Sequence, residues 1–289
     1  MNRWVLGARP RTLPAAVVPV LVGTAAAVGV PDTDVVAWRA VAALTVALAI
    51  QVATNYTNDF ADGARGTDDQ RVGPVRLVGS GLATAREVKL AALAAGGVAT
   101  VAGLALVAAV GPELLVVGAC SFAAGYFYTG GPKPYGYLGL GELFVFVFFG
   151  LVATAGSAYV QLERVSSLSV AAAIPVGLLA TALLVINNLR DIPTDVVAGK
   201  VTLAVRLGDR DTRSLYATLL IGAFVTATAV ALVRSGALAA LLAVPLAVPP
   251  VRAVLSGATG PRLVPVLGAT GKVQLAVGVL LAAGLALTA

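Results

Sequence analysis

The feature that most constrains this chain is a series of long stretches without a single charged residue. There are nine of them, each 17 to 25 residues long: 12–31, 40–58, 90–112, 114–132, 143–162, 165–189, 214–233, 235–251 and 273–289. A helix needs about 20 predominantly apolar residues to cross a bilayer. Only 12% of the residues are charged, about half of what a soluble domain carries. The sequence therefore predicts an all-α, polytopic membrane protein in which residues 1–289 form one domain, a bundle of nine transmembrane helices.

The basic residues are distributed unequally between the two sides of this predicted bundle. When the loops are assigned alternately, 17 of the 20 Lys and Arg residues fall on the side of the N-terminus, and only Arg39, Arg164 and Arg234 fall on the other. Lys and Arg are enriched in cytoplasmic loops. We therefore expect a cytoplasmic N-terminus in a multi-pass protein of the cell (plasma) membrane. The bilayer explains the net charge of +6, so no nucleic-acid partner is expected.

Two absences narrow the chemistry that the chain can perform. It contains no histidine, and Cys120 is its single cysteine. Histidine is the usual general base near neutral pH and the commonest metal ligand, and one cysteine cannot form a disulfide within the chain or a thiolate cluster. Any bound metal must therefore have oxygen ligands, which favours magnesium, calcium or manganese.

Two similar acidic segments follow the second and sixth predicted spans. The first runs from Asn55 through Asn58, Asp59 and Asp62, and the second contains Asn188, Asp191 and Asp195. If the helices continue, Asn55, Asp59 and Asp62 share one face, as do the three residues of the second segment. Pro193 is expected to end or bend the second helix near that point. Both segments are predicted to lie at the cytoplasmic membrane surface, with an active site that faces the cytoplasm.

Carboxylates at the mouth of an apolar bundle are costly unless a cation lies between them. Mg²⁺ commonly bridges one or two carboxylates to substrate phosphates, and arginine can hold a phosphate through two hydrogen bonds. Acidic segments flanked by Arg65, Arg71, Arg190 and Lys200 therefore predict a magnesium-dependent diphosphate site. The alternative interpretation is that these are solvated loop charges near the lipid headgroups.

These residues carry a resemblance to a known family. The run Asn58-Asp59-Phe60-Ala61-Asp62 and the run from Asp191 to Asp195 resemble the two Asp-rich motifs of the UbiA superfamily of intramembrane prenyltransferases. Where many relatives have a third aspartate this chain has Gly66, and the next acid is Asp68. Within that superfamily, the motif sequences are most similar to those of the enzymes that act on 1,4-dihydroxy-2-naphthoate in menaquinone synthesis. The matching features include Ala8-Arg9-Pro10-Arg11 at the start and the stretch Tyr128 to Tyr137.

The resemblance implies an enzyme that transfers a polyprenyl group from polyprenyl diphosphate to 1,4-dihydroxy-2-naphthoate, with loss of carbon dioxide and release of diphosphate. Its site residues fall into four groups. The expected Mg²⁺ ligands are Asn58, Asp59, Asp62, Asp68, Asp191 and Asp195. The expected catalytic residues are Tyr128, Lys133, Asp62, Asp191 and Asp195. Diphosphate is expected to bind Arg11, Arg65, Arg71, Lys133, Arg190 and Lys200, and Asn55 and Asn188 support the site.

Other functions remain open from the sequence. A UbiA-type enzyme with another aromatic acceptor, such as 4-hydroxybenzoate or homogentisate, would carry the same motifs. A CDP-alcohol phosphotransferase fits poorly, because its motif requires two residues between Gly63 and the Ala64-Arg65 pair, and here there are none. A secondary transporter is a further alternative, although its ion sites usually lie near the bilayer midplane and these acids lie at helix ends.

Overall fold

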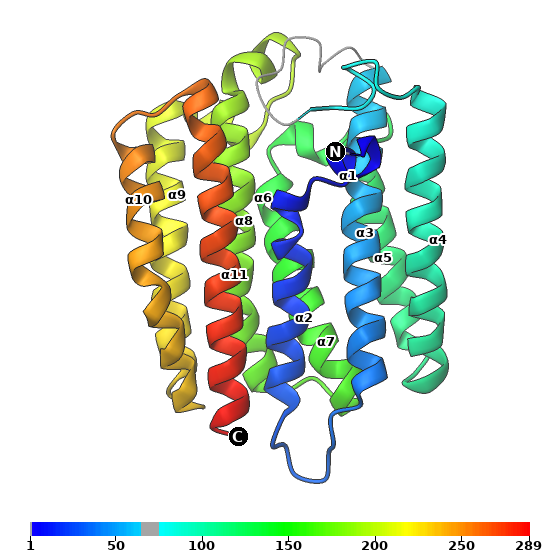
Figure 1. The fold of residues 1–289 in the computed structure, drawn as a ribbon, viewed down its shortest axis with the longest axis vertical. Helices are drawn as coiled ribbons and strands as arrows, with labels where there is room; N and C mark the ends of the chain where they lie inside the picture. The colour runs from blue at the N-terminus through cyan, green and yellow to red at the C-terminus, as the bar shows by residue number, and fades with distance from the viewer. Residues whose placement is uncertain (1, 65–74) are drawn as a thin grey trace.

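The computed structural model describes residues 2–64 and 75–289, and every element in these ranges is helical (Figure 1). The elements are α1 (Arg3–Ala8), η1 (Pro10–Thr12), α2 (Pro14–Ala27), α3 (Ala37–Ala64), α4 (Ala85–Ala109), α5 (Glu113–Phe127), η2 (Tyr135–Leu138), α6 (Gly141–Val145), η3 (Phe146–Val152), α7 (Ala153–Leu162), α8 (Ser167–Val197), α9 (Leu203–Val230), η4 (Ser235–Ala243), α10 (Val244–Leu255), η5 (Gly260–Arg262) and α11 (Leu263–Leu287). Element η3 is a π-helix, and the other η elements are 3₁₀-helices.

The predicted all-helical membrane architecture is confirmed, but the count of nine spans is not. Within the described ranges, seven helices are long and apolar enough to cross a bilayer, and an eighth is added if residues 3–12 and α2, which meet at a 53° bend, form one span. The ninth expected span, residues 114–132, corresponds to α5, which has only 15 residues and ends at Phe127. A turn replaces the helix there, just before Gly130-Gly131-Pro132.

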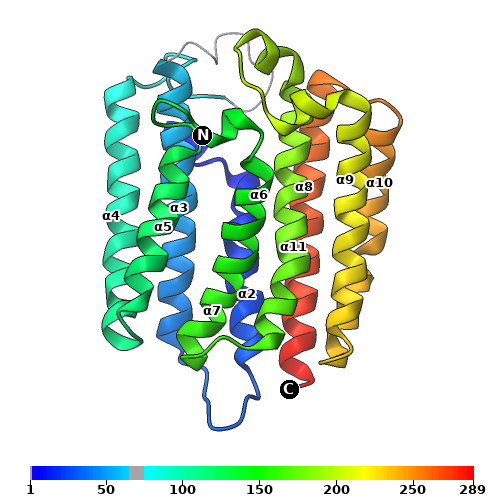
Figure 2. The ribbon, with the colours of Figure 1, turned by 180° about the vertical axis from the view of Figure 1, so that it is seen from behind.

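The loops of the bundle gather at two ends. Figures 1 and 2 place α1, the end of α3, the start of α4 and the end of α8 at one end of the bundle, and the connection from α2 to α3 and the C-terminus at the other. The two acidic segments, which end α3 and α8, therefore lie at the same end of the molecule.

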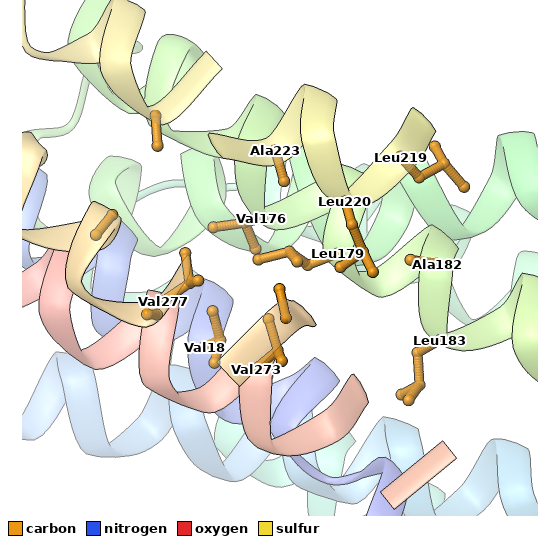
Figure 3. Close-up of a cluster of buried hydrophobic side chains, with 14 of the residues drawn as sticks. Val18, Val176, Leu179, Ala182, Leu183, Leu219, Leu220, Ala223, Val273 and Val277 are labelled. Carbon is orange, nitrogen blue, oxygen red and sulfur yellow. The ribbon is translucent and has the colours of Figure 1, made fainter. Parts of the chain in front are cut away.

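The hydrophobic core forms around α8, which packs against α2, α9 and α11 (Figure 3). Val18, Leu179, Leu220 and Val277 from these four helices are at most 1% exposed. The helices approach closely because small residues line the contacts: a Cβ at Gly278 would lie 2.4 Å from Val18 Cγ1. Such packing fixes helices in a bilayer, where burial of apolar surface gives little drive for association. Residues on α8 are therefore held in a rigid frame.

Pro193, expected to end or bend the helix, lies inside α8, four residues before the helix ends. The helix continues through this proline to Val197. A proline inside a helix removes one backbone hydrogen bond, and the tertiary packing of α8 tolerates that loss here. Continuation of the helix keeps Asn188, Asp191 and Asp195 on one face, as the spacing predicted.

Candidate active site

A cavity of about 560 Å³ lies between α2, α3, α4, α5, η3, α7 and α8, and both acidic segments line it. Its lining is polar where α3 and α8 end and apolar deeper in the bundle. Eight residues predicted for the site line this cavity: Asn55, Asn58, Asp62, Tyr128, Asn188, Asp191, Asp195 and Lys200. The opposed acidic segments thus share one compartment.

Asp62 is the centre of a buried charged network. Its side chain is 3% exposed, and its carboxylate accepts a hydrogen bond from Tyr137 Oη at 2.7 Å. Lys200 Nζ lies 3.2 Å from Oδ1, and Arg76 Nη2 lies 3.4 Å from Oδ2. Burial lowers the pKa of Lys200, but Asp62, Tyr137 and Asp195 outweigh it and raise that pKa overall. Lys200 is therefore protonated, and two cations compensate a carboxylate that would otherwise be costly to bury.

Asp191 is held from the side by its neighbour on α8. Arg190 donates two hydrogen bonds to Asp191, from Nε to Oδ1 at 2.7 Å and from Nη2 to Oδ2 at 2.8 Å, and a third to Asn187 Oδ1 at 2.6 Å. The Arg190 side chain is 1% exposed and does not line the cavity. Arg190, predicted as a diphosphate ligand, therefore orients Asp191 in this structure, while Asp191 and Asp195 face the cavity.

The structure places Asp59 away from the cavity, against its prediction as a metal ligand. Asp59 is fully buried, and its two carboxylate oxygens accept the backbone N–H groups of Leu77 at 2.7 Å and Val78 at 3.0 Å. Each residue advances an α-helix by about 100°, so Asp59 lies roughly 60° around α3 from Asp62. That rotation turns the Asp59 carboxylate toward Leu77 and Val78. Arg76 directly precedes Leu77 in the sequence. Asp59 thereby anchors the segment that carries Arg76 to the cavity.

Asn55 fixes the N-terminal segment over the same end. Its Nδ2 donates to Ala8 O at 2.9 Å and to Thr12 Oγ1 at 3.2 Å. Between these two contacts the chain turns at Arg9, which adopts a left-handed backbone conformation with φ of 53° and lines the cavity. Asn55, predicted to support the site, thus holds the backbone that brings a second arginine to the cavity.

Other predicted residues are not brought to the cavity or cannot be placed. Arg11 and Lys133 are exposed and do not line it. Arg65, Asp68 and Arg71 lie outside the described residues.

Several residues that sequence reasoning missed do contribute to the polar end. Arg9, Arg76 and Tyr137 line the cavity, and Thr129 donates to Asn58 Oδ1 at 2.7 Å. Glu142 lies behind the cavity wall and accepts a hydrogen bond from Asn188. Tyr137 and Arg9 fall within stretches that carried the family resemblance, whereas Glu142 and Arg76 had no signal beyond being charged residues near span ends.

Aromatic side chains form a column along one wall of the cavity. Tyr128, Tyr135, Phe144 and Phe148 follow one another, with ring-centroid separations of 5.5, 4.0 and 6.1 Å. Phe149, in the π-helical stretch Phe146–Val152, also lines the cavity. Burial raises the pKa of Tyr128 and Tyr135, so both stay neutral. Aromatic faces attract cations, and this wall can therefore stabilise positive charge inside the cavity.

The donor set at the polar end suits a hard divalent cation. The described residues contain no cluster of three acidic, histidine or cysteine side chains that could hold a metal ion by themselves. Arg76 and Lys200 contact Asp62, and Arg190 contacts Asp191. Mg²⁺, however, is commonly bound by one or two carboxylates together with water and substrate phosphates. Carboxylate and amide oxygens that face a shared cavity fit this mode.

The family of this chain follows from its similarity to known proteins. The model of the UbiA prenyltransferase family matches residues 16–262. The fold is similar to a UbiA homologue from Aeropyrum pernix, with a TM-score of 0.72 and 17% identity over 97% of this chain and 98% of that one. A UbiA homologue from Archaeoglobus fulgidus, solved bound to GPP and Mg²⁺, gives a TM-score of 0.66 at 16% identity, covering 97% and 99% of the two chains. The chain belongs to the UbiA prenyltransferase family, as the Asp-rich motifs predicted.

Two individual relatives are similar to this chain over most of its length. The chain is 50% identical over 284 residues to the 1,4-dihydroxy-2-naphthoate octaprenyltransferase of Mycobacterium tuberculosis. The aligned residues make up 98% of this chain and 97% of that protein. It is 41% identical to the enzyme of the same name from Escherichia coli, over 77% of this chain and 74% of that one.

Proposed function

We propose that this chain transfers a polyprenyl group from polyprenyl diphosphate to 1,4-dihydroxy-2-naphthoate, with decarboxylation of the ring, to give demethylmenaquinol, the reduced form of demethylmenaquinone. The observation that carries the proposal is the shared cavity that Asp62 of α3 lines together with Asp191 and Asp195 of α8, next to an apolar interior. The names of the relatives at 50% and 41% identity support the naphthoate acceptor.

In this proposal the diphosphate binds at the polar end of the cavity. Asp62, Asp191 and Asp195, with amide oxygens beside them, would hold Mg²⁺. The ion would stabilise the negative charge that develops on the departing diphosphate. Lys200, Arg76 and Arg9 line the same end and are placed to bind phosphate oxygens. Lys200 and Arg76 already contact Asp62, so the polyanion enters a site whose cations are in place.

The remaining residues act on the prenyl carbon and exclude water. Loss of diphosphate leaves positive charge on the allylic carbon, and the wall formed by Tyr128, Tyr135, Phe144 and Phe148 can stabilise it. The apolar interior keeps water from this carbon, which would otherwise capture it. The electron-rich naphthoate ring then attacks. No side-chain nucleophile is needed, consistent with a chain that lacks histidine.

We further propose nine spans, with residues 3–27 as the first and α5 as the fourth, a cytoplasmic N-terminus and an active site that opens toward the cytoplasm from the plasma membrane. The excess of Lys and Arg in loops of one side supports this orientation. Residues 1–289 then form one catalytic domain, with polyprenyl diphosphate, the aromatic acceptor and the bilayer as partners.

An acceptor panel tests the proposal. Purified protein in detergent receives one labelled polyprenyl diphosphate, Mg²⁺ and either 1,4-dihydroxy-2-naphthoate, 4-hydroxybenzoate or homogentisate. We expect prenylated product and diphosphate release with the naphthoate alone. Product with another acceptor would redirect the proposal within the family, and the absence of diphosphate release with all three would contradict prenyl transfer and favour a transporter.

A further inference from the structure

Glu142 is a buried acid that the proposed mechanism does not use. It lies in the first turn of α6, is 6% exposed and does not line the cavity. Tyr128 packs beside it, since a Cβ on the adjacent Gly141 would lie 3.2 Å from Tyr128 Cε2. Among the residues that the structure describes, no lysine or arginine forms an ion pair with Glu142. A carboxylate is costly in such a place unless its neighbours require it.

The contact that Glu142 makes is with the acidic segment of α8. Asn188 Nδ2 donates to Glu142 Oε1 at 2.9 Å. Asn188 lines the cavity, and Glu142 stands behind it. An ionised carboxylate can only accept hydrogen bonds, so the amide must turn its NH₂ group toward Glu142. The oxygen of a planar amide then lies on its other edge, directed away from Glu142.

We propose that Glu142 is a positioning residue that fixes Asn188 with Oδ1 directed into the cavity, so that an amide oxygen joins Asp191 and Asp195 as a donor for the divalent cation. This inference rests on the metal and diphosphate site of the proposed function. The spacing supports it, because Asn188, Asp191 and Asp195 share one face of α8.

A glutamine at position 142 isolates this effect. Glu142→Gln has nearly the same size, but its side-chain amide both donates and accepts, so Asn188 can bond to it in either orientation. The oxygen of Asn188 is then no longer held toward the cavity. Residues that orient metal ligands typically change metal affinity 10- to 100-fold when they are replaced.

The test measures Mn²⁺ binding to the full chain in detergent, by electron paramagnetic resonance with inorganic pyrophosphate present. Neither acceptor nor turnover is involved. We expect Glu142→Gln to weaken Mn²⁺ binding about tenfold. Asn188→Asp, added to Glu142→Gln, should restore binding, since a carboxylate presents an oxygen on both edges. Glu163→Gln is the matched control: Glu163 pairs with Arg39 at 2.9 Å, near the C-terminal end of α7, and its change should leave binding unaltered.

Three results would overturn the inference. The first is wild-type Mn²⁺ affinity in Glu142→Gln, and the second is equal weakening in Glu163→Gln. The third is weakening that Asn188→Asp does not restore, which indicates a general structural role for Glu142. These results leave the proposed function standing. Absence of Mn²⁺ binding in the wild-type protein with pyrophosphate would overturn both the inference and the metal site.

Discussion

Replacement of Asp59 by asparagine distinguishes an anchor of the loop after α3 from a metal ligand. The carboxylate accepts one backbone N–H on each oxygen, from Leu77 and from Val78. Asparagine keeps one acceptor, and its NH₂ group faces the other N–H, so two donors meet in a fully buried site. The segment that begins at Arg76 should therefore detach more often in Asp59→Asn.

The expected magnitude follows from the lost bond. A hydrogen bond to a charged group contributes about 1.5–3 kcal/mol, and a buried donor without a partner costs a similar amount. Partial relaxation of the loop makes about 2–3 kcal/mol a reasonable net value. Because each 1.4 kcal/mol is a factor of ten, the open population should rise roughly 30- to 150-fold.

Limited trypsin digestion measures this opening, with the Arg76–Leu77 bond followed by mass spectrometry. Arg76 is 8% exposed in the closed state, so its cleavage reports the open population when opening is fast relative to cleavage. Asp209→Asn is the control, since Asp209 also accepts two hydrogen bonds, from Arg213 at 2.6 and 2.7 Å, but lies on α9. Cleavage should accelerate in Asp59→Asn alone.

Kinetics give the second half of this experiment. The KM for polyprenyl diphosphate should rise in Asp59→Asn, because Arg76 leaves the cavity, and excess Mg²⁺ should not correct it. Unchanged cleavage at Arg76, combined with full rescue by Mg²⁺, would refute the anchor and return Asp59 to the metal ligands.

Three further predictions follow from the cavity and the core. Asp62→Ala and Asp195→Ala should each reduce prenyl transfer at least 100-fold with normal membrane insertion, measured with labelled diphosphate; near-normal turnover in both would contradict the site. Gly156 lines the cavity with open space where a Cβ would stand, so Gly156→Leu should shift preference toward shorter prenyl diphosphates in a competition assay, and an unchanged preference would argue against tail binding there. Tyr216→Phe removes a 2.7 Å bond to Thr270 and should cost about 1 kcal/mol, a fall in Tm of about 2 °C at unchanged activity; a loss of activity would contradict this.

The chain alone determined the architecture and part of the site. A bilayer requires every spanning backbone group to be hydrogen-bonded within a helix or a closed barrel. Uncharged stretches of about 20 residues match spanning helices rather than the shorter strands of a barrel, so they favour a helical bundle. The helical period likewise assigned Asn188, Asp191 and Asp195 to one face, and the structure turns that face to the cavity. Length alone overestimated the helix in the fourth stretch, where α5 ends at Phe127 rather than at residue 132, because helix and turn are equally uncharged there.

Only the tertiary structure decided what each polar residue contacts. Asp59 and Asp62 belong to the same motif, yet one binds the backbone at residues 77 and 78 and the other binds Tyr137 and Lys200. Glu142 reaches Asn188 across 46 positions of sequence. Such pairings depend on which helices lie side by side and how they are rotated. Local periodicity carries no record of the partner, so it could assign a residue to a face but not to a contact.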